Sequence, residues 1–189
     1  TLATGGGYAI HTEGNNNGNL TITDNSVRGY NGNGIDVIGT TGGDLLVQGN
    51  AVGTINNGSH GIAIGGVTGD IEVLDNRVGA IGGGIAGTGI SINATGSAGT
   101  LVQGNIVSNV LRTGIDVVGG SLATVSGNTV SNVAQAISGD GIHANSTNVF
   151  VDGNTIDDVF LGNAIALGGN AGNTVTNNRI ATGAGSTIG

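Results

Sequence analysis

The stretch Val125-Ser126-Gly127-Asn128-Thr129-Val130, with Val133 three residues further on, decides the fold of this chain. Apolar residues stand three before the asparagine and two and five after it. The same arrangement recurs at steps of 25, 26, 29, 23, 26 and 24 residues, around Asn25, Asn50, Asn76, Asn105, Asn128, Asn154 and Asn178. The seventh copy departs from it at one position, with Gly183 five residues after the asparagine. A fixed period of this size indicates a solenoid, in which each repeat forms one coil and stacks on the next.

A second phrase, Gly-Ile-x-Val or Gly-Ile-x-Ile, precedes the asparagine phrase. It stands as Gly34-Ile35-Asp36-Val37 and Gly114-Ile115-Asp116-Val117, and in a looser form as Gly7-Tyr8-Ala9-Ile10. Within both phrases apolar residues alternate with polar or small ones, which is typical of a strand with one buried face. Because no stretch shows a helical period, each repeat is expected to carry about three short strands separated by glycine-rich corners.

The residue before each asparagine predicts a tight corner. The seven positions hold glycine, aspartate or asparagine, the types that tolerate a left-handed backbone: Asp24, Gly49, Asp75, Gly104, Gly127, Gly153 and Asn177. Strands that stack on their own copies once per coil form a parallel β-helix, and right-handed winding is favoured for parallel crossovers. The sequence therefore predicts an all-β, right-handed single-stranded parallel β-helix of about seven coils of 23–29 residues, with residues 1–189 in one domain without a linker.

The V-x-G-N-x-V corner and its row of asparagines resemble the pectin-lyase-like family of right-handed β-helices, which includes adhesin and autotransporter passengers. The resemblance extends over the whole chain. It implies the fold but no single activity, since lyases, hydrolases, tailspikes and adhesins share that fold. The seven asparagines are expected to form an internal ladder in which each side-chain amide bonds its neighbours in adjacent coils, which is a structural role.

Composition excludes some classes of partner. The formal net charge is −8, there is no lysine, and the cations are four arginines. This charge repels phosphate backbones and anionic lipid surfaces, and no stretch reaches the ~20 apolar residues of a spanning helix. We expect neither nucleic-acid binding nor membrane insertion. Because methionine is absent even at position 1, a processed product or an excerpt of something longer is expected.

The x position of Gly-Ile-x-Val is expected to form an outward row, read as Ala9, Asp36, Ala63, Ser91, Asp116, His143 and Ala166. Ser91, Asp116 and His143 would then lie in consecutive coils. The order is wrong for a catalytic triad, because a serine nucleophile needs the histidine beside it and here the aspartate separates them. No catalytic residue is assigned and no enzymatic activity is expected. A polysaccharide lyase-like or hydrolase-like, carbohydrate-active β-helix is the alternative.

Asp44 and Asp70 are the candidate metal ligands. Both stand six residues before an asparagine, so they would stack about 5 Å apart in adjacent coils. Two carboxylates at that distance repel by roughly 3 kcal/mol at an effective dielectric near 20. Either the loops hold them apart, or a cation such as Ca²⁺ bridges them together with Asn19. No other cofactor is expected.

The ends of the repeat array suggest a partner. A solenoid exposes an unpaired strand edge at each end, and neither end of this sequence resembles a polar cap. The residues expected at these assembly edges are Leu2, Tyr8, Ile180 and Ile188. Either the chain is an excerpt of a longer surface fibre, or copies stack head to tail into a filament. The sequence thus predicts an extracellular or cell-surface structural protein that partners itself, with cell-surface glycans or a host surface as further partners of an adhesin.

Overall fold

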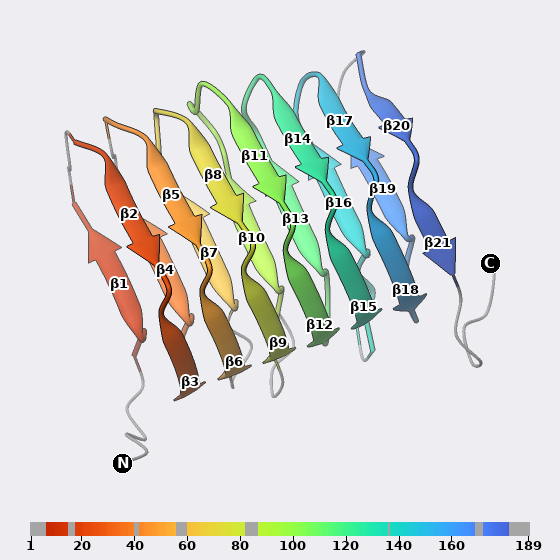
Figure 1. Cartoon of the computed structure of the whole chain (residues 1–189), viewed down its shortest axis with the longest axis horizontal. Helices are drawn as coiled ribbons and strands as arrows, with labels where there is room; N and C mark the ends of the chain where they lie inside the picture. The colour runs from red at the N-terminus through yellow and green to blue at the C-terminus, as the bar shows by residue number, and fades with distance from the viewer. Residues whose placement is uncertain are drawn as a thin grey trace.

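The computed structural model describes residues 7–14, 18–39, 42–55, 60–81, 87–135, 137–168 and 172–181. In this part of the chain there is no helix, and the strands form three parallel sheets of seven strands each, which run side by side along a rod (Figure 1). The first coil lies at one end of the rod and the last coil at the other. The prediction of an all-β parallel solenoid is confirmed.

Each coil contributes one strand to each sheet. The first sheet holds β1 (Ile10–Glu13), β4 (Ile35–Ile38), β7 (Ile62–Gly65), β10 (Ile90–Asn93), β13 (Ile115–Val118), β16 (Ile142–Asn145) and β19 (Ile165–Gly168). The second holds β2 (Leu20–Thr23), β5 (Leu45–Gln48), β8 (Ile71–Leu74), β11 (Thr100–Gln103), β14 (Ala123–Ser126), β17 (Val149–Asp152) and β20 (Thr174–Thr176). The third holds β3 (Ser26–Tyr30), β6 (Ala51–Ile55), β9 (Arg77–Ile81), β12 (Ile106–Val110), β15 (Thr129–Val133), β18 (Thr155–Val159) and β21 (Arg179–Ala181). Six full turns separate β1 from β19, its counterpart in the seventh coil.

The core is a set of apolar rows that run the length of the rod. In the fifth coil, for example, the rows are formed by Ile115 and Val117 of β13, Val125 of β14, and Val130 and Val133 of β15, all at 0% exposure. Each fully buried Val or Ile side chain stabilises the fold by about 1.5–3 kcal/mol before conformational entropy is subtracted. Stacking like residues on like residues therefore supplies the stability of every interior coil.

The corner before each asparagine is left-handed in all seven coils. The φ angles at these positions run from 53° to 68°, at Asp24, Gly49, Asp75, Gly104, Gly127, Gly153 and Asn177. The predicted corner is thus confirmed. It turns the chain sharply between the second and the third sheet, which places each asparagine at the junction of the two.

A second left-handed position lies inside the strands of the third sheet. Gly29, Asn109, Asn132 and Asp158 have φ angles between 54° and 77°, and the pairing register skips this position between β12 and β15. Strict alternation would point residues two and five after the asparagine to opposite faces. The local kink corrects this, so that Val107 and Val110 are both fully buried.

The glycine of Gly-Ile-x-Val is required by a close approach between coils. A Cβ atom on Gly114 would lie 2.6 Å from the carbonyl oxygen of Gly141 and 2.5 Å from a methyl carbon of Val130. A Cβ atom on Gly89 would likewise lie 2.6 Å from the carbonyl oxygen of Gly114. Since real Cβ atoms do not approach a carbonyl this closely, the repeat keeps glycine wherever this corner is tightly packed.

The first coil differs from the expected register. Ile10 pairs with Ile35 and His11 with Asp36, so the outward row begins with His11, and the assignment of Ala9 to that row is wrong. The two registers differ by two residues, and a shift of two leaves every side chain on the same face of a strand. The alternating pattern alone therefore could not distinguish them.

Candidate functional site

The row of asparagines forms a continuous hydrogen-bonded ladder along the rod. The Nδ2 group of Asn105 donates to Oδ1 of Asn128 at 3.0 Å and to the carbonyl oxygen of Val73 at 2.8 Å. The backbone N–H of Asn105 donates to the same Asn128 oxygen at 2.9 Å. The five interior members of the row are buried: Asn50, Asn76, Asn105, Asn128 and Asn154. Each rung thus connects three coils and satisfies backbone groups at the corner.

The ladder has a direction and two different ends. In every step the amide groups of one coil donate to the side-chain oxygen of the next, from Asn25 to Asn50 and finally from Asn154 to Asn178. Within the described residues, Oδ1 of Asn25 therefore receives no donor. At the other end, the backbone N–H of Asn178 has no acceptor among the described residues. One end of the rod presents an acceptor and the other a donor.

Asp44 and Asp70 lie in adjacent coils and line one groove of about 270 Å³ on the second sheet, together with Glu72. The side-chain oxygen of Asn19 accepts the backbone N–H of Asp44 at 3.0 Å, and Oδ1 of Asp44 accepts that of Asp70 at 3.1 Å. Each side chain thus caps the following coil. In the described part of the chain no group of three or more His, Cys, Asp or Glu side chains is arranged to hold a metal ion.

Two histidine–aspartate pairs lie on the outer face of the first sheet. Nδ1 of His143 lies 2.7 Å from Oδ1 of Asp116, and Ser91 pairs with Asp116 from the opposite side. In this row the aspartate stands between the histidine and the serine. The second pair joins Nδ1 of His11 to Oδ2 of Asp36 at 2.8 Å, and the Asp36 side chain is only 1% exposed.

His60 lies at the corner beside these pairs. Its backbone N–H donates to Oδ1 of Asn33 at 2.8 Å, while its buried Nδ1 atom has no hydrogen-bond partner in the described structure. Burial lowers the pKa of His60 below its usual 6.5, and Arg112 adds to this effect, whereas the charges of Asp116 and Asp36 oppose it. A neutral imidazole is therefore the favoured form at neutral pH.

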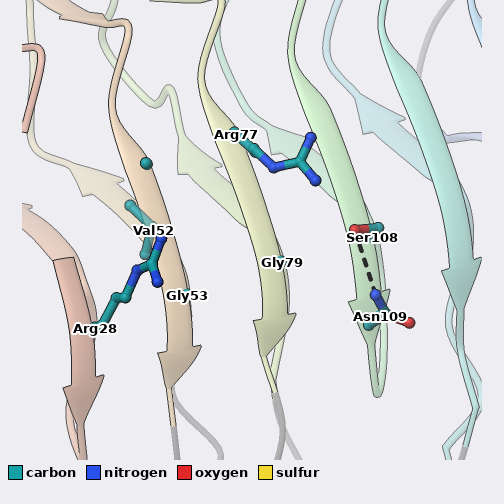
Figure 2. Close-up of a pocket in the computed structure, with 8 residues that line it drawn as sticks. Arg28, Val52, Gly53, Arg77, Gly79, Ser108 and Asn109 are labelled. Atoms are coloured by element: carbon teal, nitrogen blue, oxygen red, sulfur yellow. Dashed lines mark hydrogen bonds between the residues drawn. The ribbon is translucent and has the colours of Figure 1, made fainter. Parts of the chain in front are cut away.

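A groove with a basic rim runs across the third sheet. It has a volume of about 270 Å³ and is lined by Arg28, Ala51, Val52, Gly53, Arg77, Gly79, Ser108 and Asn109. Figure 2 shows Arg28 reaching from β3 over β6 and Arg77 reaching from β9 toward β12, with Gly53 and Gly79 forming the floor. Two of the four arginines of the chain thus lie at one groove that contains no carboxylate.

This basic groove was not foreseen from the sequence. The sequence feature that indicates it is the position three residues after each asparagine. In four consecutive coils this position holds Arg28, Gly53, Gly79 and Ser108. That position faces outward, and a row of this kind becomes visible only when the repeats are aligned vertically. His11 was missed for a different reason, the two-residue ambiguity in the first coil.

The residues expected at the assembly edges fall into two groups. Leu2 and Ile188 lie outside the described residues. The ring of Tyr8 stacks on that of His11, with 4.4 Å between centroids. Ile180 occupies the core row of the last coil and is 53% exposed, and Val175 beside it is 47% exposed. Their counterparts one coil earlier, Ile156 and Val151, are fully buried.

The last coil is tied to the preceding one by polar bonds outside the core. The Thr176 hydroxyl donates to Oδ1 of Asp152 at 2.7 Å, and the Asn177 amide donates to the same oxygen at 2.9 Å. These two bonds lower the pKa of the exposed Asp152 carboxyl. The outermost strands are therefore held in register even though their apolar side chains are open to solvent.

Comparison with known proteins identifies the fold family. A family model described as the right handed beta helix region matches residues 88–189, which is more than half of the chain. No curated protein and no solved structure matches. A search of the described residues for a helix long and apolar enough to cross a membrane finds none. The ladder, the three parallel sheets and the family match agree, and the chain belongs to the right-handed parallel β-helix family.

Proposed function

We propose that this protein is an extracellular structural protein whose copies stack head to tail into a filament. The observation that carries the proposal is the apolar face of the last coil, where Val175 and Ile180 lie in core rows and are about half exposed. Covering such a face with another coil removes this apolar surface from water, which is favourable at about 25 cal/mol per Å². A parallel β-helix coil is the shape that fits, because it continues every row.

The two ends of the asparagine ladder support a second copy as the occupant. Asn178 offers a backbone N–H, and Asn25 offers a side-chain oxygen that receives no donor in the described structure. Placing Asn25 of one copy next to Asn178 of another would repeat the bond that joins Asn154 to Asn178 at 2.9 Å. The contact is heterologous and does not close, so it propagates into a fibre.

Localisation outside the cell is proposed from the resemblance to adhesin and autotransporter passengers. The acidic surface, with a net charge of −8 and no lysine, supports solubility and disfavours binding to nucleic acids or anionic membranes. A fibre of this kind presents its loops and outer sheet faces to a glycan or a host surface. We propose a structural role for the coils themselves and recognition by the exposed faces.

The assembly can be tested by sedimentation velocity of the purified 189-residue chain and two variants. Ile180→Asp places a charge on the apolar end face, and we expect it to shift the protein to single rods. Ile106→Asp is the matched control, because Ile106 faces outward from a middle coil and is 40% exposed. We expect the control to assemble as the wild type does. Equal sedimentation of wild type, Ile180→Asp and control as single rods would contradict stacking.

A carbohydrate-active role is the second candidate, and the groove that Asp44, Asp70 and Glu72 share favours it. Grouped carboxylates are the usual catalytic groups of glycoside hydrolysis, and Ca²⁺ binds carboxylate and amide oxygens. Depolymerisation assays on acidic polysaccharides, with and without calcium, test this role. Activity that Asp44→Ala abolishes would establish it in place of a purely structural one.

A further inference from the structure

We propose that the basic groove on the third sheet binds a tetrahedral oxyanion, with sulfate as its simplest form. This site is independent of end-to-end stacking. It is defined by Arg28 and Arg77 on its rim, Gly53 and Gly79 on its floor, and the polar side chains of Ser108 and Asn109 on its far wall.

Both rim arginines lack a carboxylate partner. All twelve Asp and Glu side chains and all four arginines lie within the described residues. Among these residues Arg179, on the same sheet, pairs with Asp157 at 3.3 Å, whereas neither Arg28 nor Arg77 forms an ion pair. In a protein with three times as many carboxylates as cations, two unpaired guanidinium groups at one groove are free to bind an external anion.

The backbone conformation does not explain why glycines form the floor of this groove. Gly53 and Gly79 do not have left-handed backbones, and a Cβ atom on Gly53 would meet only the Gly79 carbonyl oxygen, at an ordinary 3.4 Å. The later coils carry side chains at the same position, with Ser108, Ser131 and Asp157. A Cβ atom on Gly79 would lie 3.2 Å from Oγ of Ser108, a side-chain atom that can move. Neither glycine is therefore required by its backbone conformation, and together they leave the floor of the groove open.

The chemistry of the lining selects the ligand class. Guanidinium groups and the Asn109 amide are hydrogen-bond donors, and the Ser108 hydroxyl can also donate. A tetrahedral oxyanion presents acceptor oxygens in several directions, which suits donors that approach from different sides of a groove, whereas one arginine fork is enough for a planar carboxylate. The net charge of −8 opposes long polyanions, so a single sulfate or phosphate group fits best.

The experiment is a titration of the ¹⁵N-labelled Ile180→Asp chain, which we expect to remain as single rods, with sodium sulfate at constant ionic strength. Because the chain has no lysine and four arginines, the Nε–H signals form a small, resolvable set. We expect the Arg28 and Arg77 signals to shift along a saturable curve, and those of Arg112 and Arg179 to change little. If all four signals move together without saturation, or if none moves, the site does not exist.

Variants separate the groove from a general ion atmosphere. Arg28→Gln and Arg77→Gln should each weaken sulfate binding at least tenfold, and Gly53→Ser should do so by filling the floor. Arg179→Gln is the matched control on the same sheet, and we expect a change of less than twofold. Wild-type affinity in both rim variants would overturn the proposal.

A second titration compares glucosamine 6-sulfate with glucosamine and with inorganic sulfate, to distinguish a sulfate group carried by a sugar from a free ion. Tighter binding of the sulfated sugar than of inorganic sulfate indicates a sugar-borne group. The reverse order indicates the free ion.

Discussion

The side-chain amide of Asn105 donates to the side-chain oxygen of Asn128 at 3.0 Å, although 23 residues separate the two along the chain. This bond lies in the buried interior of the rod, where its groups have no access to bulk water. A single residue type thus joins successive coils, because its carboxamide both donates and accepts. The asparagine that recurs in the sequence is explained by this geometry.

Replacing Asn105 with alanine removes a rung from the middle of this ladder. The backbone N–H of Asn76 and the carbonyl oxygen of Val73 would lose their partner. Buried groups left unsatisfied cost about 1–3 kcal/mol each, so we expect the free energy of unfolding to fall by about 2–4 kcal/mol. Urea unfolding measures this. Both substitutions are compared in the Ile180→Asp background, which we expect to remain as single rods. Asn25→Ala, at the half-exposed end of the ladder, is the control and should cost less; equal losses would show that the ladder does not act through burial.

Gly114→Ala tests the close approach between coils. The added Cβ would lie 2.6 Å from the Gly141 carbonyl oxygen, and overpacking of this kind typically costs about 1–3 kcal/mol. Gly53→Ala adds the same methyl group on the outer face of the rod, where its nearest neighbour is 3.4 Å away. We expect thermal unfolding of the second variant to match the wild type. A Gly114→Ala protein as stable as Gly53→Ala would contradict the packing described for this corner.

His60 predicts a pH dependence of stability. Burial lowers its pKa in the folded state, so below the unfolded value of about 6.5 the unfolded chain binds the proton more readily. The contribution of His60 is therefore complete above about pH 6.5 and is lost as the pH falls toward the folded pKa. Asp116, Asp36 and Arg112 are the charges that act on it.

The variant His60→Gln removes this titration. We expect the free energy of unfolding of the wild type to decline more steeply than that of His60→Gln between pH 7 and pH 5, a window set by the pKa of an ordinary histidine at about 6.5. Urea unfolding of both proteins across this window provides the comparison. Two parallel curves would mean that His60 is not the group responsible.

Much of the fold follows from the sequence because residues at the same position of successive repeats lie next to each other in adjacent coils. The corner residues such as Gly127 and Asn128 and the apolar rows of Val125 and Val130 recur in every coil, so one coil predicts the others. The kink at Asn109 was harder to foresee, because two members of its row are Thr54 and Ala80, which do not favour a left-handed backbone. Only the burial of both Val107 and Val110 makes it evident.

The outer faces were less predictable than the core. The row of Ser91, Asp116 and His143 could be read from one phrase, but His11 could not, because a two-residue shift preserves the facing of every side chain. The basic groove depends on the absence of side chains at Gly53 and Gly79. In a chain with 41 glycines, two of them do not predict a groove until the residues beside them in the adjacent coils are known.

In the proposed filament, copies of this chain add to one another through their end faces. Electron microscopy of the purified 189-residue chain tests it most directly. Seven coils at about 4.8 Å per coil give a single rod of roughly 34 Å. We expect unbranched filaments many times this length, with the Ile180→Asp variant remaining as single rods. A uniform population of short rods for the wild type, at concentrations where sedimentation is also measured, would contradict it.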